Sequence, residues 1–553
     1  MKMTGAQAII KVLQEQGIET VFGYPGGAVI PLYNALYDAP IKNVLTAHEQ
    51  GAIHAADGYA RASGKVGVCI ATSGPGATNI VTGLATAYLD SIPLVAISGQ
   101  VPVANLGRDA FQEIDIVGVT MPITKYNAIV RKSEELVPML RKAFAIAKNG
   151  RPGPVLIDVP SDLQVKELDY PELEEIKLPE VMKADEGIVE KAAAALNGAE
   201  RPVLMVGGGA VTSAVEAELM ELAHKADLPV VSTLMGLGVY PGSDERAIGL
   251  TGMHGHIDCN LAVANADVLI VAGSRLSDRV TGDRNRYAGT KTIIHMDIDP
   301  SELDKNVVVP MHLSGDLKET LAKFLPLVKE SKHPEWWHQI RDWDKMEERF
   351  LTDGSRLTAP WVMTQLNKTF ADRDTIFVTD VGQNQMWAAQ YLTIDKPRHH
   401  LTSGGCGTMG IGLPGAMGAA FAKPDSQIVH ICGDGGFKMT GMEMFTASRE
   451  NLPLISIVIN NSCLGMVRQW QQLFYNERYS ATILTEFDFV GFAKSCGADG
   501  RTVTTCEEFT EALKEAQGRT KPFLIEVRVE QSDLVEPMVA AGAVIYDFVK
   551  THI

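Results

Sequence analysis

The chain has 553 residues, which is enough for three or four domains at about 150 residues each. Hydrophobic residues make up 46% and charged residues 21%, a composition typical of a globular protein that excludes a collagen, a coiled coil or a disordered chain. The 50 basic and 67 acidic residues give a net charge of −17, the wrong sign for a protein that covers a nucleic-acid backbone. We therefore expect no nucleic-acid partner, and we expect anionic ligands to be held by local cations, backbone N–H groups or a metal ion.

The seven cysteines and the first residues indicate the compartment. No Cys-x-x-Cys pair is present, so we predict neither a disulfide framework nor a zinc site, and a reducing cytoplasm fits best. No run of 18 apolar residues predicts a membrane span, and the first residues lack the apolar core of a signal peptide. Instead, Thr4 and Gln7 form a capping-box pattern and Gly17 supplies a stop, so we expect no membrane association and a folded helix at the start.

Apolar, β-branched segments that end in Gly, Asp or Asn alternate with helical segments along the chain. Strands of this kind, without polar alternation, are typical of parallel sheets covered by helices on both faces. The predicted strands lie, in chain order, in residues 66–76, 93–99, 154–160, 202–209, 267–274, 292–299, 375–382, 428–436, 454–461 and 523–529.

The sequence repeats itself at long range. Residues 150–159 (GRPGPVLIDV) align with 518–527 (GRTKPFLIEV), and two further pairs of segments align at nearly the same offset. We infer an α/β fold of three doubly wound parallel-sheet domains, the first and third related by internal duplication. Charged, proline-containing stretches at 165–190 and 329–358 read as linkers or surface helices. The predicted domains are therefore 1–165, 190–328 and 358–553.

The sharpest local motif is Gly433-Asp434-Gly435, which follows one predicted strand, with Asn461 at the end of the next. Parallel strands would bring a carboxylate and an amide oxygen to the same sheet edge, and such oxygens suit Mg²⁺. The alternative is a strand-end turn with a helix-capping Asp.

This motif resembles the diphosphate motif of thiamine diphosphate enzymes. The resemblance implies that Asp434, Asn461 and the main-chain carbonyl of Cys463 bind the metal. It also implies a set of cofactor contacts, namely Gly382, Gln383, Gly407, Met409, Gly433, Asp434, Gly435, Gly436, Asn461, Cys463, Leu464, Gly465 and Met466. Within this set, Met409 would wedge behind the cofactor and hold it bent.

Glu49 lies in the segment HEQGA at the start of a predicted helix. A lone Glu in that position is usually a favourable partner of the helix dipole. Its place in the segment matches the activating Glu of the same enzymes, which contacts the cofactor and exchanges a proton with its aminopyrimidine nitrogen. The resemblance therefore makes Glu49 both a catalytic and a cofactor-binding residue.

Motifs spread from residue 23 to residue 471 narrow the resemblance. They are GYPGG, TSGPGATN, DAFQEID, GMHG, DRVTG, HMDIDP, GTMGIGLPGA and GMVRQWQ. Together they resemble the acetohydroxyacid synthases, the large catalytic subunits of acetolactate synthase. The resemblance implies that pyruvate is decarboxylated on thiamine diphosphate and that the hydroxyethyl carbanion condenses with pyruvate or 2-ketobutyrate, giving 2-acetolactate or 2-aceto-2-hydroxybutyrate for branched-chain amino acid biosynthesis.

The same resemblance assigns residues to the reacting centre. Gly27 would lie near it, Phe111 and Gln112 would line the pocket, and Met253 and Trp470 would shape the site for the second ketoacid. Arg279 would bind the carboxylate of that ketoacid, which suits the planar fork of a guanidinium.

The middle domain resembles the FAD-binding domain of the family, in which the flavin would be a structural cofactor. The implied contacts are Arg151, Gly207, Gly208, His254, Gly273, Arg275, Asp297 and Asp316. The usual Arg-Phe-Asp-Asp-Arg stretch reads Arg-Leu-Ser-Asp-Arg at residues 275–279, so an aromatic ring and a carboxylate are missing from it. The resemblance also implies a homodimer or homotetramer with active sites at the subunit interface, and a small regulatory subunit as a further partner.

Two other functions stay open. The chain resembles other thiamine diphosphate enzymes as well, such as pyruvate oxidase or a 2-ketoacid decarboxylase, although neither of these needs the receptor for a second ketoacid that Arg279 and Trp470 would form. A non-catalytic nucleotide-binding protein could also retain this fold.

Overall fold

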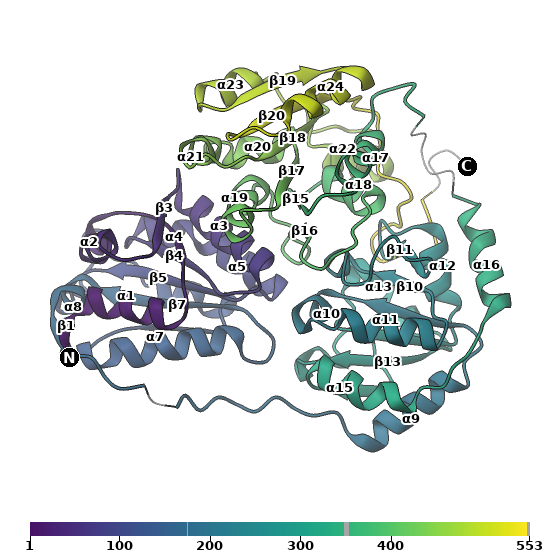
Figure 1. The fold of residues 1–553 in the computed structure, drawn as a ribbon, viewed down its shortest axis with the longest axis horizontal. Helices are drawn as coiled ribbons and strands as arrows, with labels where there is room; N and C mark the ends of the chain where they lie inside the picture. The colour runs from purple at the N-terminus through teal and green to yellow at the C-terminus, as the bar shows by residue number, and fades with distance from the viewer. Residues whose placement is uncertain (174, 348–352, 550–553) are drawn as a thin grey trace.

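The computed structural model describes residues 1–173, 175–347 and 353–549, which form three α/β units (Figure 1). Each unit contains a six-stranded parallel sheet flanked by helices, as predicted. In Figure 1 the first unit is purple to blue, the second teal and the third green to yellow. Residue 174 and residues 348–352 of the predicted linkers, and residues 550–553 of the predicted third domain, lie outside the described part.

The first sheet has the strand order β3-β2-β4-β5-β7-β6. Its strands are β2 (Thr20–Tyr24), β3 (Lys42–Leu45), β4 (Gly67–Ala71), β5 (Leu94–Gln100), β6 (Tyr126–Ile129) and β7 (Pro154–Pro160). Its helices are α1 (Gly5–Glu15), α2 (Ile30–Tyr37), α3 (Glu49–Ser63), α4 (Pro75–Asn79), α5 (Val81–Asp90), α6 (Ile116–Thr120), α7 (Ser133–Lys148) and α8 (Ser161–Val165). The predicted capping box is present, since Thr4 and Gln7 bond each other's backbone at the start of α1.

A small antiparallel pair extends the first unit past the predicted boundary. Strand β1 (Lys2–Thr4) pairs with β8 (Glu167–Asp169), which follows the last helix of the unit. The start of the chain is therefore tied to the segment that leaves the unit.

The third sheet has the order β16-β15-β17-β18-β20-β19. Its strands are β15 (Thr375–Thr379), β16 (His400–Leu401), β17 (Gln427–Gly433), β18 (Ile455–Asn460), β19 (Asp499–Val503) and β20 (Phe523–Arg528). Its helices are α17 (Ala359–Phe370), α18 (Gln383–Tyr391), α19 (Gly412–Ala422), α20 (Asp434–Thr440), α21 (Glu443–Arg449), α22 (Gly465–Phe474), α23 (Phe489–Ser495) and α24 (Cys506–Ala516). This strand order is the same as in the first sheet, and the segments that the sequence aligns are β4 with β17, β5 with β18 and β7 with β20. The shared topology agrees with the predicted duplication.

The middle sheet has the order β11-β10-β9-β12-β13-β14, which is the Rossmann order with its reversal between β9 and β12. Its strands are β9 (Pro202–Val206), β10 (Val230–Ser232), β11 (Ala247–Leu250), β12 (Val268–Ala272), β13 (Thr292–Asp297) and β14 (Met311–Ser314). Its helices are α9 (Glu186–Asn197), α10 (Gly208–Ser213), α11 (Glu216–Lys225), α12 (Ile257–Asn265), α13 (Asp278–Thr281), α14 (Arg284–Tyr287), α15 (Leu317–Phe324) and α16 (Pro334–Asp344). Helix α16 lies in the second predicted linker but packs on this unit, because Trp336 and Ile340 join its core.

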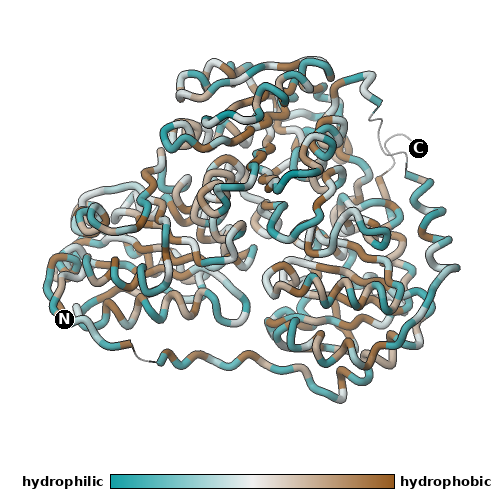
Figure 2. The backbone as a smooth tube through the Cα atoms, viewed as in Figure 1, coloured by the Kyte–Doolittle hydropathy of each residue, from teal (hydrophilic) through white to brown (hydrophobic). Residues whose placement is uncertain are grey.

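Hydrophobic stretches run along the strands of each unit (Figure 2). Every residue of β4, β5, β7, β9 and β12 is buried, because helices cover both faces of a parallel sheet. The apolar runs predicted from the sequence therefore form the core.

The first and third units pack closely through α3 and α19. A Cβ on Gly58 would lie 2.1 Å from the carbonyl oxygen of Gly415, and a Cβ on Gly418 would lie 1.9 Å from that of Ala55. Glycines on both helices thus allow the two backbones to touch, which fixes how the two related units sit on each other.

Two further expectations concern helices and thiols. In the part of the chain that the structure describes, no helix is both long and apolar enough to cross a membrane. All seven cysteines are free thiols, six of them buried and Cys406 exposed.

Candidate active site

The strand orders define where ligands can enter. In a doubly wound sheet the binding crevice lies at the carboxyl ends of the two strands between which the order reverses. These strands are β2 and β4 in the first unit, β9 and β12 in the second, and β15 and β17 in the third. The turns that follow them carry many of the predicted site residues, including Gly27, Gly207, Gly208, Gly273, Gly382, Gly433 and Asp434.

The third unit has a cavity of about 60 Å³ at its reversal point. Most of the predicted cofactor contacts line it, namely Gly382, Gln383, Met409, Gly433, Asp434, Gly435, Gly436, Asn461, Cys463, Leu464, Gly465 and Met466. The structure therefore brings together twelve residues that span more than eighty positions of the sequence.

Asp434 and Asn461 provide oxygen atoms in this cavity. Asp434 Oδ1 accepts the Gly435 N–H at 3.0 Å, whereas Oδ2 is buried and has no hydrogen-bond partner among the described residues. Burial raises the pKa of the Asp434 carboxyl to about 6. Asn461 Oδ1 accepts the Cys463 N–H at 3.3 Å, and its amide group donates to Gln383 Oε1 at 3.0 Å. An unpartnered buried carboxylate oxygen beside an amide oxygen fits a hard divalent cation such as Mg²⁺.

Glycines keep this cavity open along the backbone. A Cβ on Gly435 would lie 2.7 Å from Leu464 Cδ2, and one on Gly436 would lie 2.4 Å from Asp380 Oδ1. A side chain at either position would need its neighbour to move, so the backbone N–H groups stay accessible to a phosphate.

Asp380 is a site residue that the sequence analysis missed. Its buried carboxylate accepts the N–H groups of Gly410 at 2.9 and 3.0 Å, of Gly412 at 3.0 Å and of Val381 at 2.7 Å. Burial raises the pKa of this carboxyl. Asp380 thus holds the turn that follows Met409, and its place at the end of a predicted strand was the available signal.

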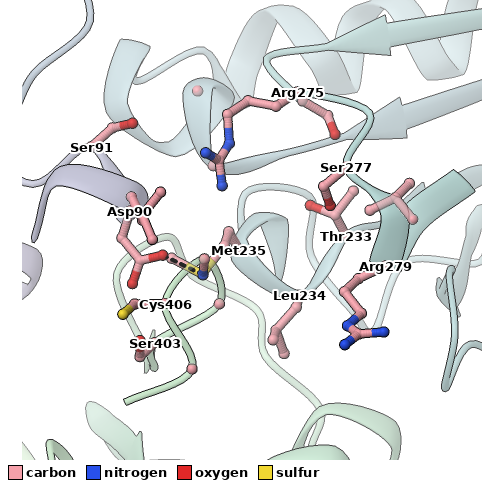
Figure 3. A pocket seen from close by; sticks show the side chains of 18 of the residues that line it. Asp90, Ser91, Thr233, Leu234, Met235, Arg275, Ser277, Arg279, Ser403 and Cys406 are labelled. Atoms are coloured by element: carbon pink, nitrogen blue, oxygen red, sulfur yellow. Dashed lines mark hydrogen bonds between the residues drawn. The ribbon is translucent and has the colours of Figure 1, made fainter. Parts of the chain in front are cut away.

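A second cavity, of about 830 Å³, opens between the three units (Figure 3). Of the predicted flavin contacts, Arg151, Gly208, His254, Gly273, Arg275 and Asp297 line it. Gly207 and Asp316 are not among its lining residues. A Cβ on Gly207 would lie 2.4 Å from the Gly273 carbonyl oxygen, and Asp316 caps α15 by accepting the N–H groups of Lys318 and Glu319. Gly207 and Asp316 therefore support the segments that form the cavity walls but do not line the cavity.

The size and lining of this cavity fit a dinucleotide. Gly273 has φ +65°, and a Cβ there would lie 2.6 Å from the backbone nitrogen of Ala210, so only glycine lets the turns after β9 and β12 meet. Arg275 reaches into the cavity from the middle unit (Figure 3). Leu276, where the family usually has an aromatic residue, belongs to the core of the middle unit and does not line the cavity.

The loop 403–407 closes the cavity from the third unit, and the first unit holds this loop. Asp90 Oδ1 accepts the Gly405 N–H at 2.6 Å (dashed line in Figure 3), and Thr86 Oγ1 lies 2.6 Å from Thr408 Oγ1. Gly407, a predicted cofactor contact, lines the cavity from this loop.

Arg279, Met253 and Trp470 line the other side of the same cavity. Arg279 Nη1 lies 3.6 Å from Met253 Sδ and 3.7 Å from Asp278 Oδ2, and the Arg279 side chain is 56% exposed, so its guanidinium forms a solvent-exposed ion pair at the edge of the cavity. The neighbouring His254 is neutral near pH 7, because burial and the nearby Arg279 lower its pKa to about 4. The three residues predicted for the second ketoacid therefore line one cavity, and two of them, Arg279 and Met253, are in contact.

The segment after β20 returns to this side of the cavity and fixes it. Val539 N–H donates to the Met253 carbonyl at 2.8 Å, and Asp283 N–H donates to the Ala543 carbonyl at 2.8 Å. The turns around Arg279 are thus held by the C-terminal segment.

The remaining predicted residues form a separate face of the first unit. Glu49 is 9% exposed and its Oε2 accepts a hydrogen bond from the Asn79 side-chain amide at 3.0 Å. Gln112 packs against Gly74, where a Cβ would lie 2.9 Å from Gln112 Cβ. Phe111 is 87% exposed. Asn79 lies within the TSGPGATN motif, and its contact with Glu49 is a site feature that the sequence alone does not predict.

This face is not part of either cavity. Glu49, Gly27, Phe111 and Gln112 are absent from the residues that line the two cavities within the described part of the chain. Within one copy of the chain, therefore, neither cavity joins Glu49 to the residues around Asp434.

Comparison with known proteins agrees with this architecture. Three family models match: "Thiamine pyrophosphate enzyme, N-terminal TPP binding domain" over residues 3–119, the central domain over 189–324, and the C-terminal TPP binding domain over 380–527. Each match falls within one of the three units.

Curated relatives match the chain over nearly its whole length. The "Probable acetolactate synthase large subunit" of Methanocaldococcus jannaschii is 45% identical over 98% of this chain and 94% of its own. The "Acetolactate synthase isozyme 2 large subunit" of Escherichia coli K12 is 43% identical over 98% of both chains. The "Acetolactate synthase large subunit" of Haemophilus influenzae is 39% identical over 99% of this chain and 98% of its own.

Proposed function

Because the chain belongs to the acetolactate synthase large subunits, a family of thiamine pyrophosphate enzymes, we propose that it converts two molecules of pyruvate into one 2-acetolactate and one CO₂. With 2-ketobutyrate as the second ketoacid, the product is 2-aceto-2-hydroxybutyrate. The observation that carries this proposal is the placement of Arg279, Met253 and Trp470 in one cavity, because a decarboxylase or an oxidase needs no receptor for a second ketoacid.

The cofactor of the family is thiamine diphosphate. When bound, it supplies the carbon nucleophile that adds to the ketone of pyruvate and the electron sink that allows CO₂ to leave. Glu49 would hold and move a proton at the aminopyrimidine nitrogen, and the Asn79 amide orients its carboxylate. The glycines around Asp434 would hold the diphosphate.

Mg²⁺ would join the diphosphate to the third unit. Asp434 Oδ2 is the buried oxygen that lacks a partner among the described residues, and Asn461 and the carbonyl of Cys463 would be the other protein ligands. Such a set of two neutral oxygens and one carboxylate would leave positions for water and phosphate oxygens, as Mg²⁺ prefers.

The active site is completed by a second copy of the chain in this proposal. Exposed apolar side chains follow the residues of both halves of the site along the sequence. In the first unit these are Phe111, on the same face as Glu49, and Met121, ten residues later in the chain. In the third unit they are Met439, Met442 and Phe445, which come shortly after Asp434 in the chain. Such patches are typical of surfaces that another chain covers. A homodimer in which Glu49 of one copy faces the Asp434 cradle of the other would bury them, and two such dimers would make a tetramer.

The large cavity would hold FAD beside the second ketoacid. Glycines 208, 209 and 273 allow a pyrophosphate to approach the backbone, and Arg275 supplies a positive charge. Two pyruvates and the products acetolactate and CO₂ are at the same total oxidation level, so the flavin would serve the fold. Arg279 would bind the carboxylate of the second ketoacid through both oxygens, with Met253 and Trp470 beside it.

The names of the relatives suggest a further partner. They are called large subunits, so we propose that a small regulatory subunit binds this chain. Seven free thiols suit a reducing compartment, and we place the enzyme in the cytoplasm.

Product analysis tests the proposed function. The purified protein is given pyruvate, thiamine diphosphate and Mg²⁺ in air, and products are followed by NMR while dissolved oxygen is recorded. We expect one acetolactate for every two pyruvates without oxygen uptake, and no turnover by Glu49→Gln. Acetaldehyde as the main product, or acetate or acetyl phosphate with oxygen uptake, would refute the proposal in favour of a decarboxylase or an oxidase. No turnover by the wild type would favour a binding protein.

A further inference from the structure

A buried carboxylate of the third unit reaches across to the first unit beside Glu49. Glu443 is the first residue of α21 and is 1% exposed. Its Oε1 accepts the N–H groups of Ala47 at 3.1 Å and of His48 at 3.2 Å, and its Oε2 accepts the Ala47 N–H at 3.1 Å. The two donors directly precede Glu49 in the chain.

The carboxylate is itself fixed on its own helix. Thr446, one turn further along α21, donates its hydroxyl to Glu443 Oε2 at 2.8 Å. Both carboxylate oxygens are therefore engaged, and the side chain is oriented before it meets the first unit.

The turn before Glu49 is held from its other side by the first sheet. Thr46 N–H donates to the Gly23 carbonyl at 3.2 Å, and the Thr46 hydroxyl donates to the His48 carbonyl at 2.9 Å. The turn thus lies between β2 of its own unit and Glu443 of the third unit, with α3 starting at Glu49. A change at Glu443 would free one side of the turn and let Glu49 shift.

The contact leaves no room for adjustment. A Cβ on Gly51 would lie 1.9 Å from Glu443 Oε1. Gly51 lies two residues after Glu49 on the same helix, so the carboxylate rests directly on the first turn of α3. A carboxylate is also favoured there because it meets free N–H groups at the positive end of a helix.

We propose that Glu443 is a positioning residue that fixes the backbone from which Glu49 projects, and so sets how fast Glu49 activates thiamine diphosphate. The inference rests on the proposed role of Glu49. It assigns to Glu443 no contact with substrate or cofactor.

The test measures activation of the cofactor without pyruvate. The holoenzyme with thiamine diphosphate and Mg²⁺ is mixed with D₂O and quenched in acid, and NMR gives the rate at which the thiazolium C2 proton exchanges. We expect Glu49→Gln to lose this exchange and Glu443→Ala to slow it about tenfold or more, with the affinity for thiamine diphosphate within about threefold of wild type. Glu443→Gln keeps an oxygen for Ala47 and His48 and should retain most of the rate.

Glu450, the residue that directly follows α21, provides a matched control. It also reaches across to the first unit, where its carboxylate pairs with Lys42 at 2.7 Å, but this contact lies on β3 and not on the Glu49 turn. Glu450→Gln should exchange at the wild-type rate. An equal slowing by Glu450→Gln and Glu443→Ala would overturn the proposal, because it would mean that any loosening of the contact between the units has the same effect.

A wild-type exchange rate in Glu443→Ala would overturn it as well. This outcome differs from failure of the proposed function, in which the wild type would not make acetolactate or Glu49→Gln would keep the exchange.

Should Glu443→Ala not fold, Gly51→Ala perturbs the same contact from the other side and should slow exchange. If Glu443→Ala folds, adding Gly51→Ala to it should slow exchange little further, because the Glu443 oxygen that the new Cβ would meet has been removed. Wild-type exchange in Gly51→Ala would contradict the proposal.

Discussion

The side-chain amide of Asn79 donates a hydrogen bond to Glu49 Oε2 at 3.0 Å, which joins the end of α4 to the start of α3. The two residues come from separate motifs of the first unit. The bond fixes the direction of the carboxylate, whereas Glu443 holds the backbone behind it.

The first prediction concerns this pair. Asn79→Ala removes the donor, so the Glu49 carboxylate can rotate away from its position. We expect kcat to fall about tenfold while the KM for pyruvate stays within about threefold of wild type. Thr78→Ala, next to it on α4, removes a hydroxyl that donates to the Pro75 carbonyl at 3.1 Å, and it is the control that should leave both values unchanged. Equal losses in the two variants would count against the role of Asn79.

The second prediction concerns the second ketoacid. Arg279→Gln removes the guanidinium that lies 3.6 Å from Met253 Sδ in the large cavity. We expect the KM for the second ketoacid to rise about tenfold or more and acetaldehyde to appear as a by-product, because the first ketoacid is still decarboxylated. Single-turnover release of CO₂ separates the two halves of the reaction and should change little. Arg284→Gln on α14, outside the cavity lining, is the control and should leave the KM for the second ketoacid unchanged. A loss of the first half-reaction in Arg279→Gln would contradict this assignment.

The third prediction concerns the flavin. Gly273→Ala places a Cβ 2.6 Å from the backbone of Ala210 at a residue with φ +65°. The turns after β9 and β12 must then separate, so we expect the purified variant to lose the visible absorbance of bound flavin while its affinity for thiamine diphosphate is kept. Gly289→Ala, also at positive φ but 3.9 Å from its nearest contact, tests for general strain and should retain flavin. Full flavin content in Gly273→Ala would show that the cavity binds FAD in another way.

The fourth prediction concerns pH. Asp158 is buried in β7, where Ser98 and Gln100 donate to its carboxylate at 2.6 and 2.9 Å, and burial raises its pKa from 3.8 to about 7. The folded state therefore binds this proton more tightly than the unfolded chain, so the stabilisation is complete below about pH 4 and is lost as the pH rises through 7. We expect the melting temperature of Asp158→Asn, which is neutral at every pH, to exceed that of the wild type at pH 8 by more than at pH 5. A difference that does not change with pH would contradict the shifted pKa.

The sequence predicts the inner strands well and the edges poorly. All ten predicted segments contain strands, and most strands outside these segments lie at sheet edges, such as β11 (Ala247–Leu250) and β16 (His400–Leu401), although the inner strands β2 and β10 were missed as well. Inner strands are covered on both faces and are mostly apolar, whereas an edge strand is short, partly exposed and defined by the partner with which it pairs.

The candidate site divides in a similar way. Residues next to each other in a motif, such as Asp434 and its glycines, are visible in the sequence because the chemistry needs them in one turn. Glu443 acts on backbone groups of the first unit, so only the packing of the two units reveals it, whereas Asp380 lies at the end of a predicted strand and its contact with the turn after Met409 appears only in the folded third unit. Phe111 is exposed in one chain, as expected if the proposed second copy covers it.

The most direct test of this account mixes two inactive variants. Glu49→Gln and Asp434→Asn are each purified, shown to be inactive at limiting Mg²⁺, and then dissociated together and reassociated. In a dimer formed from one copy of each, one active site combines the intact Glu49 of one chain with the intact Asp434 of the other. We expect acetolactate formation to return to about a quarter of the wild-type rate at equal amounts of the two variants, since about half of the dimers are mixed and each of these has one intact site. Mixed dimers that form but stay inactive would mean that Glu49 and Asp434 of the same chain serve one site, and would contradict the account.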